Sequence, residues 1–221
     1  MKNVAGYDVS RVMAGSLGIL GVLCEVSIKV MPRCQATRTL CLEGDEAAAL
    51  ARLTTWAREG LPITASAWCD GRLWVRFGGA KAAVARAAAG AEVEPREAAR
   101  WWAAVRDHRH EFFVLAEPEL ARGDCLWRLA LPDATGPLTL EGRPFIEWGG
   151  CQRWYRSAAG GSDIRAAATA AGGHATLFRA ADKSAGAFTL PSPTSMQLHR
   201  RLKQAFDPQG IFNPGRLYPG L

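Results

Sequence analysis

The chain has 221 residues, of which 48% are hydrophobic and 22% charged, and its formal net charge is +6. This length allows one large domain or two small ones, and the composition is that of an ordinary globular protein. Dispersed arginines without a run of like charges disfavour nucleic-acid binding. The lack of a signal pattern or a span of ~20 apolar residues predicts a cytoplasmic protein, held at a membrane only through partner subunits if at all.

The N-terminal segment begins with a short helical turn and a glycine-rich loop. Asp8 or Ser10 can cap a turn over residues 11–13, and the sequence GSLGILG occupies residues 15–21. Closely spaced glycines let backbone N–H groups approach an anionic group or a flat ring, although three simple turn glycines explain the pattern equally well. The loop is neither GxGxxG before a helix nor a Walker A sequence, which disfavours NAD and ATP.

An alternating segment follows this loop. Over Val22–Val30 apolar side chains occupy every second position, which predicts a half-buried strand. Pro32 ends the strand, since proline cannot donate to a sheet ladder. We therefore divide the chain into residues 1–34, a larger domain at 35–190, and a C-terminal helix and tail at 191–221.

The middle of the chain contains two runs of strands and helices. The first run is strand 37–42, helix 45–58, a hairpin of strands 63–69 and 72–77 around Asp70-Gly71, helix 80–89 and helix 96–107. The second is strand 125–131, a hairpin of strands 144–148 and 153–155, helix 163–171 and strand 174–178, with a last helix at 194–206. Two β-α-β-β-α-like runs in tandem predict an α+β fold, with an antiparallel sheet covered by helices on one face.

Three histidines are candidates for acid–base chemistry. His108 and His110 are two residues apart and could serve a hydroxy acid beside Arg106 and Arg109, although a solvated helix end explains them more simply. His174 opens a strand, as an active-site residue often does, and a structural role is equally compatible with that position.

The tryptophans and cysteines favour structural roles. Trp101 and Trp102 are expected in the core, and Trp148 and Trp154 there or as anchors of a subunit interface. The six cysteines are expected to be small buried residues of a reducing compartment. Their spacing matches neither a zinc site nor an iron–sulfur cluster, so we expect no metal in this chain.

Two stretches at the ends of the chain resemble known flavoproteins. KNVAGYDVSRVMAGSLGILGVLCEVSIKVMP, at residues 2–32, is similar to the end of the PCMH-type FAD-binding domain in the vanillyl-alcohol-oxidase-type family. FDPQGIFNPGR, at residues 206–216, resembles the segment by which such chains return to the flavin. VRDHRHEFF, FIEWGGCQRWY and GGHATLFR narrow the likeness to the FAD-binding subunits of glycolate oxidases, in which the middle domain is the FAD-linked oxidase cap.

The resemblance implies FAD as the cofactor and a set of contacts to it. The amide of Asn213 would approach the isoalloxazine or ribityl region, where it can both donate and accept. Many relatives have glutamate at the position of Leu17, so this loop lacks a carboxylate. The pyrophosphate and adenine side would be lined mainly by the backbone of Gly6, Tyr7, Gly15, Ser16, Gly18, Gly21 and Val22.

The resemblance also implies an activity and partners. The chain would be a subunit of an FAD-dependent 2-hydroxy-acid oxidoreductase that takes hydride from glycolate. It would pass electrons to a larger FAD-containing subunit and an iron–sulfur subunit. The family's FAD domain begins with a subdomain that has no counterpart here, so we expect Met1 to be an internal methionine of a longer natural chain. The alternative is a truncated, flavin-free subunit that binds the same partners.

Overall fold

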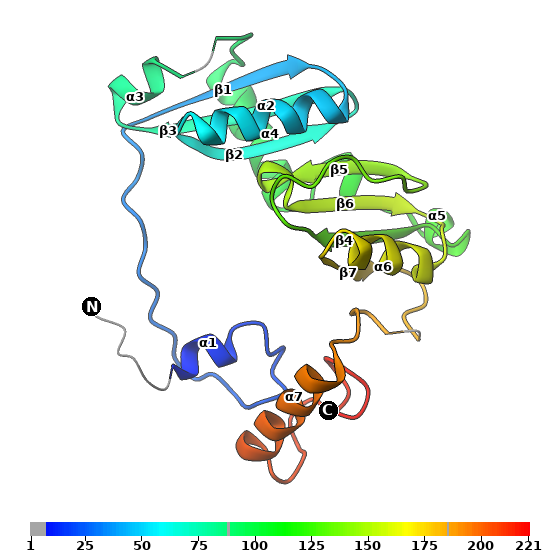
Figure 1. The fold of residues 1–221 in the computed structure, drawn as a ribbon. Helices are drawn as coiled ribbons and strands as arrows, with labels where there is room; N and C mark the ends of the chain where they lie inside the picture. Colours follow the sequence, from blue (N-terminus) through cyan, green and yellow to red (C-terminus); the bar gives the residue numbers. More distant parts are fainter. Residues whose placement is uncertain (1–7, 88, 185) are drawn as a thin grey trace. The chain divides into compact units, whose positions relative to one another are not determined.

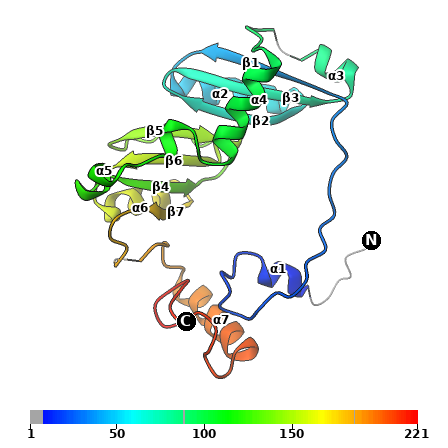
Figure 2. The same cartoon turned by 180° about the vertical axis from the view of Figure 1, so that it is seen from behind.

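The computed structural model describes residues 8–221 except 88 and 185, and the chain forms two compact units. The larger unit is residues 31–183, and the smaller one joins the segment up to residue 30 with residues 184–221. No helix in the described residues is both long and apolar enough to cross a bilayer. The elements, drawn in Figures 1 and 2, are α1 (Val9–Met13), β1 (Ala36–Glu43), α2 (Glu46–Arg58), β2 (Ile63–Cys69), β3 (Arg72–Gly79), α3 (Lys81–Ala85), α4 (Pro95–Arg106), η1 (Glu111–Phe113), α5 (Glu117–Ala121), β4 (Cys125–Ala130), β5 (Arg143–Glu147), η2 (Trp148–Gly150), β6 (Gln152–Ser157), α6 (Gly161–Ala170), β7 (His174–Arg179) and α7 (Pro193–Phe206).

The larger unit is built on one seven-stranded sheet with the order β1-β3-β2-β5-β6-β4-β7. Every pairing in it is antiparallel. The two halves of the sheet join where β2 pairs with β5, with Ala67 opposite Glu147 and Trp68 opposite Ile146. The predicted α+β class and antiparallel sheet are therefore confirmed.

Local sequence signals begin and turn several of these elements. Asp45 caps α2, because its carboxylate accepts the N–H of Ala48 at 2.8 Å. Asp70 and Gly71 have φ values of 48° and 75°, the left-handed pair that a type I′ hairpin turn requires. Pro95 occupies the first turn of α4, where its missing N–H costs nothing. The predicted helices at 45–58 and 96–107 and the hairpin between them are confirmed.

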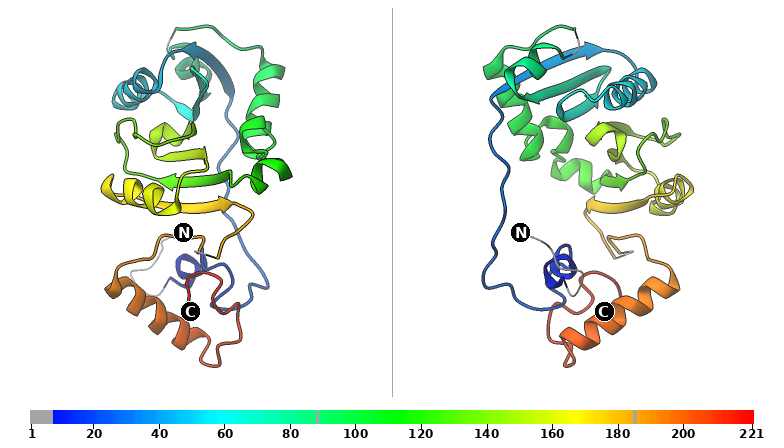
Figure 3. Two further views of the ribbon diagram at one scale, coloured as in Figure 1. Left: turned by 90° about the vertical axis from the view of Figure 1, so that its right-hand side faces the viewer. Right: turned by 60° about the vertical axis from the view of Figure 1, so that its left-hand side comes forward.

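Helices cover both faces of the sheet, which corrects the prediction of one covered face. Leu53 of α2 and Ile164 of α6 belong to clusters on one face, and Val105 of α4 belongs to the cluster on the other. Figure 3 shows α2 and α6 on one side of the strands and α4 on the opposite side. The reason is visible in β4, where the neighbouring residues Leu126 and Trp127 point to opposite faces and both are buried.

The second run has the predicted order of elements. Its strands and helix follow one another as β4-β5-β6-α6-β7, so the helix comes after three strands. The run adds an antiparallel half-sheet, because β6 pairs with both β4 and β5.

The predicted strand at Val22–Val30 is wrong. The segment contains no strand, and its apolar side chains are exposed, with Val22 at 75% and Ile28 at 77% of full exposure. Alternating apolar and polar residues give a strand one face that can be buried. Its backbone N–H and C=O groups must also form hydrogen bonds with a neighbouring strand. No segment among the described residues pairs with this one.

The tryptophans divide into buried and exposed ones. Trp101 stacks on Trp74 with ring centroids 4.3 Å apart, and Trp102 packs beside it, as predicted for the core. Trp154 lies inside the same cluster, so it is not a surface anchor. Trp148, in contrast, is 70% exposed.

The cysteines are less buried than predicted. Cys69 is buried, and burial raises the pKa of its thiol to about 12. Cys24 and Cys34 are exposed, and the other three are partly exposed. Among the described residues no three His, Cys, Asp or Glu side chains group as metal ligands.

Candidate cofactor site

The glycine-rich loop and the C-terminal tail are hydrogen-bonded to each other within the smaller unit. The Nδ2 of Asn213 donates to the carbonyl oxygen of Leu17 at 3.1 Å. The Nζ of Lys203 donates to the carbonyl oxygens of Ile19 and Phe212, each at 2.7 Å. Two stretches that resemble flavoprotein motifs at opposite ends of the sequence thus form one structure.

An apolar cluster supports this junction. Ile19, Leu20 and Leu221 are each less than a tenth exposed. Burial of such side chains contributes ~25 cal/mol per Å² of apolar surface, so the cluster stabilises the contact between the chain ends. The partly buried residues packed around it are Val12, Met13, Met196, Phe206, Leu217 and Tyr218.

A buried ion pair stands next to the cluster. Lys203 and Asp207 are 8% and 3% exposed, and the Nζ of Lys203 lies 2.5 Å from the Oδ2 of Asp207. The carboxylate also accepts the N–H groups of Ile211 at 3.1 Å and Phe212 at 2.8 Å. Burial by itself raises the pKa of Asp207, but these hydrogen bonds outweigh it and hold the pKa below its ordinary value.

Sequence reasoning missed the role of Lys203. The residue follows Arg200 and Arg201, a stretch that is typical of a solvated helix face. The available signal is its spacing, because Lys203 precedes the aspartate of FDPQG by one helical turn. A lysine at that position can reach back over the tail that follows the helix.

Backbone geometry accounts for the glycines of the loop. Gly15 and Gly18 have φ values of 79° and 75°, a conformation that costs other residues free energy. A Cβ on Gly18 would stand 2.7 Å from the Nδ2 of Asn213, whereas one on Gly15 or Gly21 would meet nothing within 4 Å. A side chain at position 18 would therefore have to displace the amide of Asn213, whereas the other two glycines leave open space beside the backbone.

The loop fits an anionic group bound through the backbone. Among the described residues, the N–H groups of Leu17 and Gly18 donate to no protein acceptor. Leu17 is also in the left-handed region, with a φ of 53°, and is 45% exposed. Successive N–H groups in such conformations form concave anion sites. The residues present are thus suited to a phosphate group such as the pyrophosphate of FAD.

The predicted cofactor residues fall into two groups. Gly6 and Tyr7 lie outside the described residues. The other six residues, from the loop and the tail, lie in the smaller unit, and the exposed ones include Gly15 and Asn213. The side-chain amide nitrogen of Asn213 donates a hydrogen bond to the carbonyl oxygen of Leu17, so this side chain anchors the loop.

His108 and His110 pack among aromatic side chains. The ring of His108 stacks on Phe113 at 4.5 Å and meets Trp154 edge-on at 4.9 Å. The Nδ1 of His110 accepts the N–H of Phe112 at 3.3 Å. Burial lowers the pKa of both histidines, so the neutral rings are favoured.

The arginines expected beside these histidines are engaged elsewhere. Arg106 and Arg109 both bind Asp107, at 2.7 and 2.8 Å, and hydrogen bonds from the two guanidinium groups lower the pKa of that carboxyl to about 2. His174 is exposed at the start of β7. No contact between His174 and the other two histidines occurs among the described residues, so the three do not form one cluster.

Comparison with known proteins agrees with the sequence motifs. Residues 182–217 match the family described as FAD linked oxidases, C-terminal domain, and this match includes α7 and the tail. Over its whole length the chain is 41% identical, across 223 aligned residues, to the glycolate oxidase subunit GlcE of Escherichia coli strain K12. The predicted resemblance is confirmed. The chain spans 60% of the length of this relative.

The match places the family's motif on residues with a clear structural role. Lys203, Asp207 and Asn213 all lie within the matched segment and all contact the loop or hold the tail against it. The family is one of FAD-linked oxidases, and the relative is a subunit of a glycolate oxidase.

Proposed function

We propose that the chain is an FAD-binding subunit of a glycolate oxidase, that is, of a 2-hydroxy-acid dehydrogenase complex. The observation that carries the proposal is the hydrogen bond from Asn213 to Leu17, which joins the two flavoprotein-like stretches. The 41% identity to a glycolate oxidase subunit supports the same activity.

Each part of the smaller unit has a proposed task. The loop from Gly15 to Val22 binds the pyrophosphate side of FAD through backbone N–H groups, with the hydroxyl of Ser16 as a further donor. Asn213 holds this loop and offers its amide oxygen to the cofactor, while Lys203 holds the tail. When bound, FAD supplies the acceptor for the hydride of a 2-hydroxy acid.

The remaining assignments extend this proposal. Residues 1–34 would be the end of a PCMH-type FAD-binding domain, residues 35–190 the cap, and residues 191–221 the segment that returns to the flavin. Of the histidines His108, His110 and His174, only the last has a largely exposed side chain among the described residues, which favours it as the acid–base candidate. Electrons would pass to a larger FAD-containing subunit and an iron–sulfur subunit, through which any association with a membrane would also occur.

Bound flavin tests the proposal directly. The chain would be purified alone and together with the partner subunits, and its visible absorption spectrum would be recorded. We expect the complex to contain more flavin than the partner subunits hold without this chain, and we expect this excess to fall after Asn213→Ala but not after Gln197→Ala at an exposed position of α7. Absence of flavin from the chain alone, together with no excess in the complex, would reject the proposal.

A flavin-free subunit that binds partners is the second candidate. The observation that favours it is the exposed apolar segment, in which Val22, Ile28 and Met31 are each more than 70% exposed. Contiguous exposed apolar side chains are typical of surfaces that another protein covers. Recovery of a stable complex with no flavin beyond that of the partner subunits would support this candidate over the first.

A further inference from the structure

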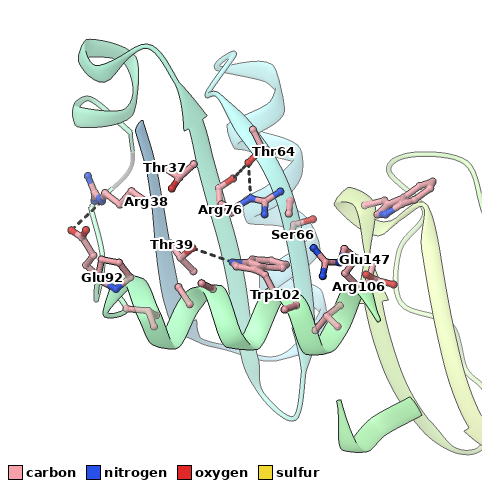
Figure 4. A pocket seen from close by; sticks show the side chains of 18 of the residues that line it. Thr37, Arg38, Thr39, Thr64, Ser66, Arg76, Glu92, Trp102, Arg106 and Glu147 are labelled. Atoms are coloured by element: carbon pink, nitrogen blue, oxygen red, sulfur yellow. Dashed lines mark hydrogen bonds and ion pairs between the residues drawn. The ribbon is translucent and has the colours of Figure 1, made fainter. Parts of the chain in front are cut away.

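A groove in the larger unit lies between α4 and one face of the strands β1, β3 and β2. Its cavity volume is about 610 Å³, and Figure 4 shows the polar side chains that enter it from the strands and from the helix. None of its lining residues belongs to the glycine-rich loop or the tail. The groove is therefore distinct from the candidate cofactor site.

Arg76 is the central charged group of the groove. Its Nε donates to the Oγ1 of Thr64 at 3.0 Å, and its guanidinium lies over the ring of Trp102, 5.5 Å from the centroid. Trp102 is itself held by a hydrogen bond from its Nε1 to the Oγ1 of Thr39 at 3.1 Å. Among the described residues, the terminal nitrogens of Arg76 have no hydrogen-bond or ion-pair partner. A guanidinium held in this way is pre-organised to bind a planar oxyanion with its two terminal nitrogens.

The other two arginines of the groove are already paired with carboxylates, whereas the hydrogen-bond partners of Glu147 are neutral groups. Arg38 pairs with Glu92 at 3.4 Å, and Arg106 pairs with Asp107. Glu147 accepts hydrogen bonds from the side chains of Gln152 and Trp154, at 3.0 and 2.6 Å. The guanidinium of Arg76 can therefore balance one negative charge on a ligand. The carboxylate of Glu147, which lines the same groove, repels a second negative charge.

Trp148 provides an apolar surface at the edge of the groove. Its side chain is 70% exposed and its φ is 53°, a conformation that is unfavourable for a bulky residue. The turn is held by the N–H of Gly149, which donates to the Oγ of the buried Ser66 at 2.8 Å. Strain of this kind persists where the surroundings enforce it, and it is concentrated at ligand sites.

We propose that this groove binds a small organic monocarboxylate. Its two oxygens accept hydrogen bonds from the terminal nitrogens of Arg76, and its apolar part lies against the indole of Trp148. The hydroxyl of Ser66, on the strand between β3 and β5, is available for a polar substituent between these two points. A phosphate dianion is disfavoured because a single free guanidinium faces it and Glu147 is nearby. The site requires neither flavin nor partner subunits, so it stands independently of the proposed function.

The test is calorimetric titration of the full chain with phenylacetate, phenylacetamide and inorganic phosphate. We expect phenylacetate to bind. The neutral amide and phosphate should bind at least about tenfold more weakly than phenylacetate. Arg76→Met should weaken phenylacetate binding about tenfold, and Trp148→Ala about threefold. The matched control is Arg52→Met. Arg52 also lies over a tryptophan, 5.9 Å from the ring centroid of Trp56, but it is outside the groove. This variant should bind phenylacetate as tightly as the wild type.

A second measurement needs no variant. In the ¹⁵N-labelled wild-type chain, phenylacetate should shift the indole N–H signals of Trp102 and Trp148 and leave that of Trp56 in place. The proposal is overturned if the amide or phosphate binds as tightly as phenylacetate. It is also overturned if Arg52→Met weakens binding as much as Arg76→Met, or if the Trp102 and Trp148 signals do not move.

Discussion

The side-chain amide of Asn213 donates to the carbonyl oxygen of Leu17 at 3.1 Å and so links residues 196 positions apart in the sequence. Ordering the ends of so long a chain costs entropy, and one exposed hydrogen bond does not offset that cost. The contact is maintained because the buried cluster around Ile19 and the ion pair at Lys203 stabilise the same junction. We therefore expect loop and tail to respond together when either is altered.

Alanine substitutions at Gly15 and Gly18 should distinguish backbone strain in the loop from a steric clash with the tail. Gly15→Ala introduces only a left-handed alanine, which should lower the free energy of unfolding of the smaller unit by about 1 kcal/mol. Gly18→Ala adds a clash with Asn213 and should cost about 1 kcal/mol more. Hydrogen exchange at Ile19 and Leu20 measures both effects, and equal protection in the two variants would contradict the contact.

Loss of the Lys203 ammonium should loosen the smaller unit selectively. Lys203→Met leaves Asp207 and two backbone carbonyls without their donor, so exchange at Ile211 and Phe212 should accelerate about tenfold or more. Arg200→Met, at an exposed position of the same helix, is the control and should change nothing. Acceleration spread equally over the larger unit would argue against a local role.

Stability of the larger unit should fall as the pH decreases below 6.5. The folded-state pKa values of His108 and His110 lie below the ordinary value of 6.5, so the unfolded chain binds more protons there. The stabilisation is fully present above pH 6.5 and is lost as the pH falls through the folded-state pKa values. Imidazole NMR titrations should give midpoints below 6.5, and thermal unfolding should follow the same trend.

A variant that lacks these two histidines is the control for this pH dependence. Asparagine tolerates the φ of 53° at position 108 and does not titrate, so His108→Asn combined with His110→Asn should flatten the profile. An unchanged slope in the double variant would assign the effect to other groups.

Arg153 should be among the most sensitive positions of the sheet. The side chain is fully buried, its Nη1 lies 3.4 Å from Glu46, and it donates to the carbonyls of Gly136, Gly150 and Thr135. Arg153→Met should lower the free energy of unfolding by about 3–5 kcal/mol, because its partners remain buried without it. Thermal unfolding followed by circular dichroism measures the loss. A melting temperature like that of the wild type would show that these contacts are dispensable.

Much of the larger unit could be predicted because its signals are local. Asp45 caps the helix that follows it, and Asp70-Gly71 has the one turn type that such a pair favours. The prediction failed at Val22–Val30, where the alternating pattern is real but the described residues include no strand to pair with it. The alternation of apolar residues defines one face of a strand, whereas strand pairing depends on which segment lies beside it in the fold.

The candidate cofactor site was predictable as two motifs and not as one structure. GSLGILG and FDPQGIFNPGR can be read separately, and each resembles a flavoprotein segment without any knowledge of the fold. The fold adds that Asn213 lies directly against Gly18 and that Lys203 is buried. It also shows that Arg76 faces a groove without a carboxylate partner among the described residues. These properties depend on contacts between residues far apart in the chain, and no short-range pattern encodes them.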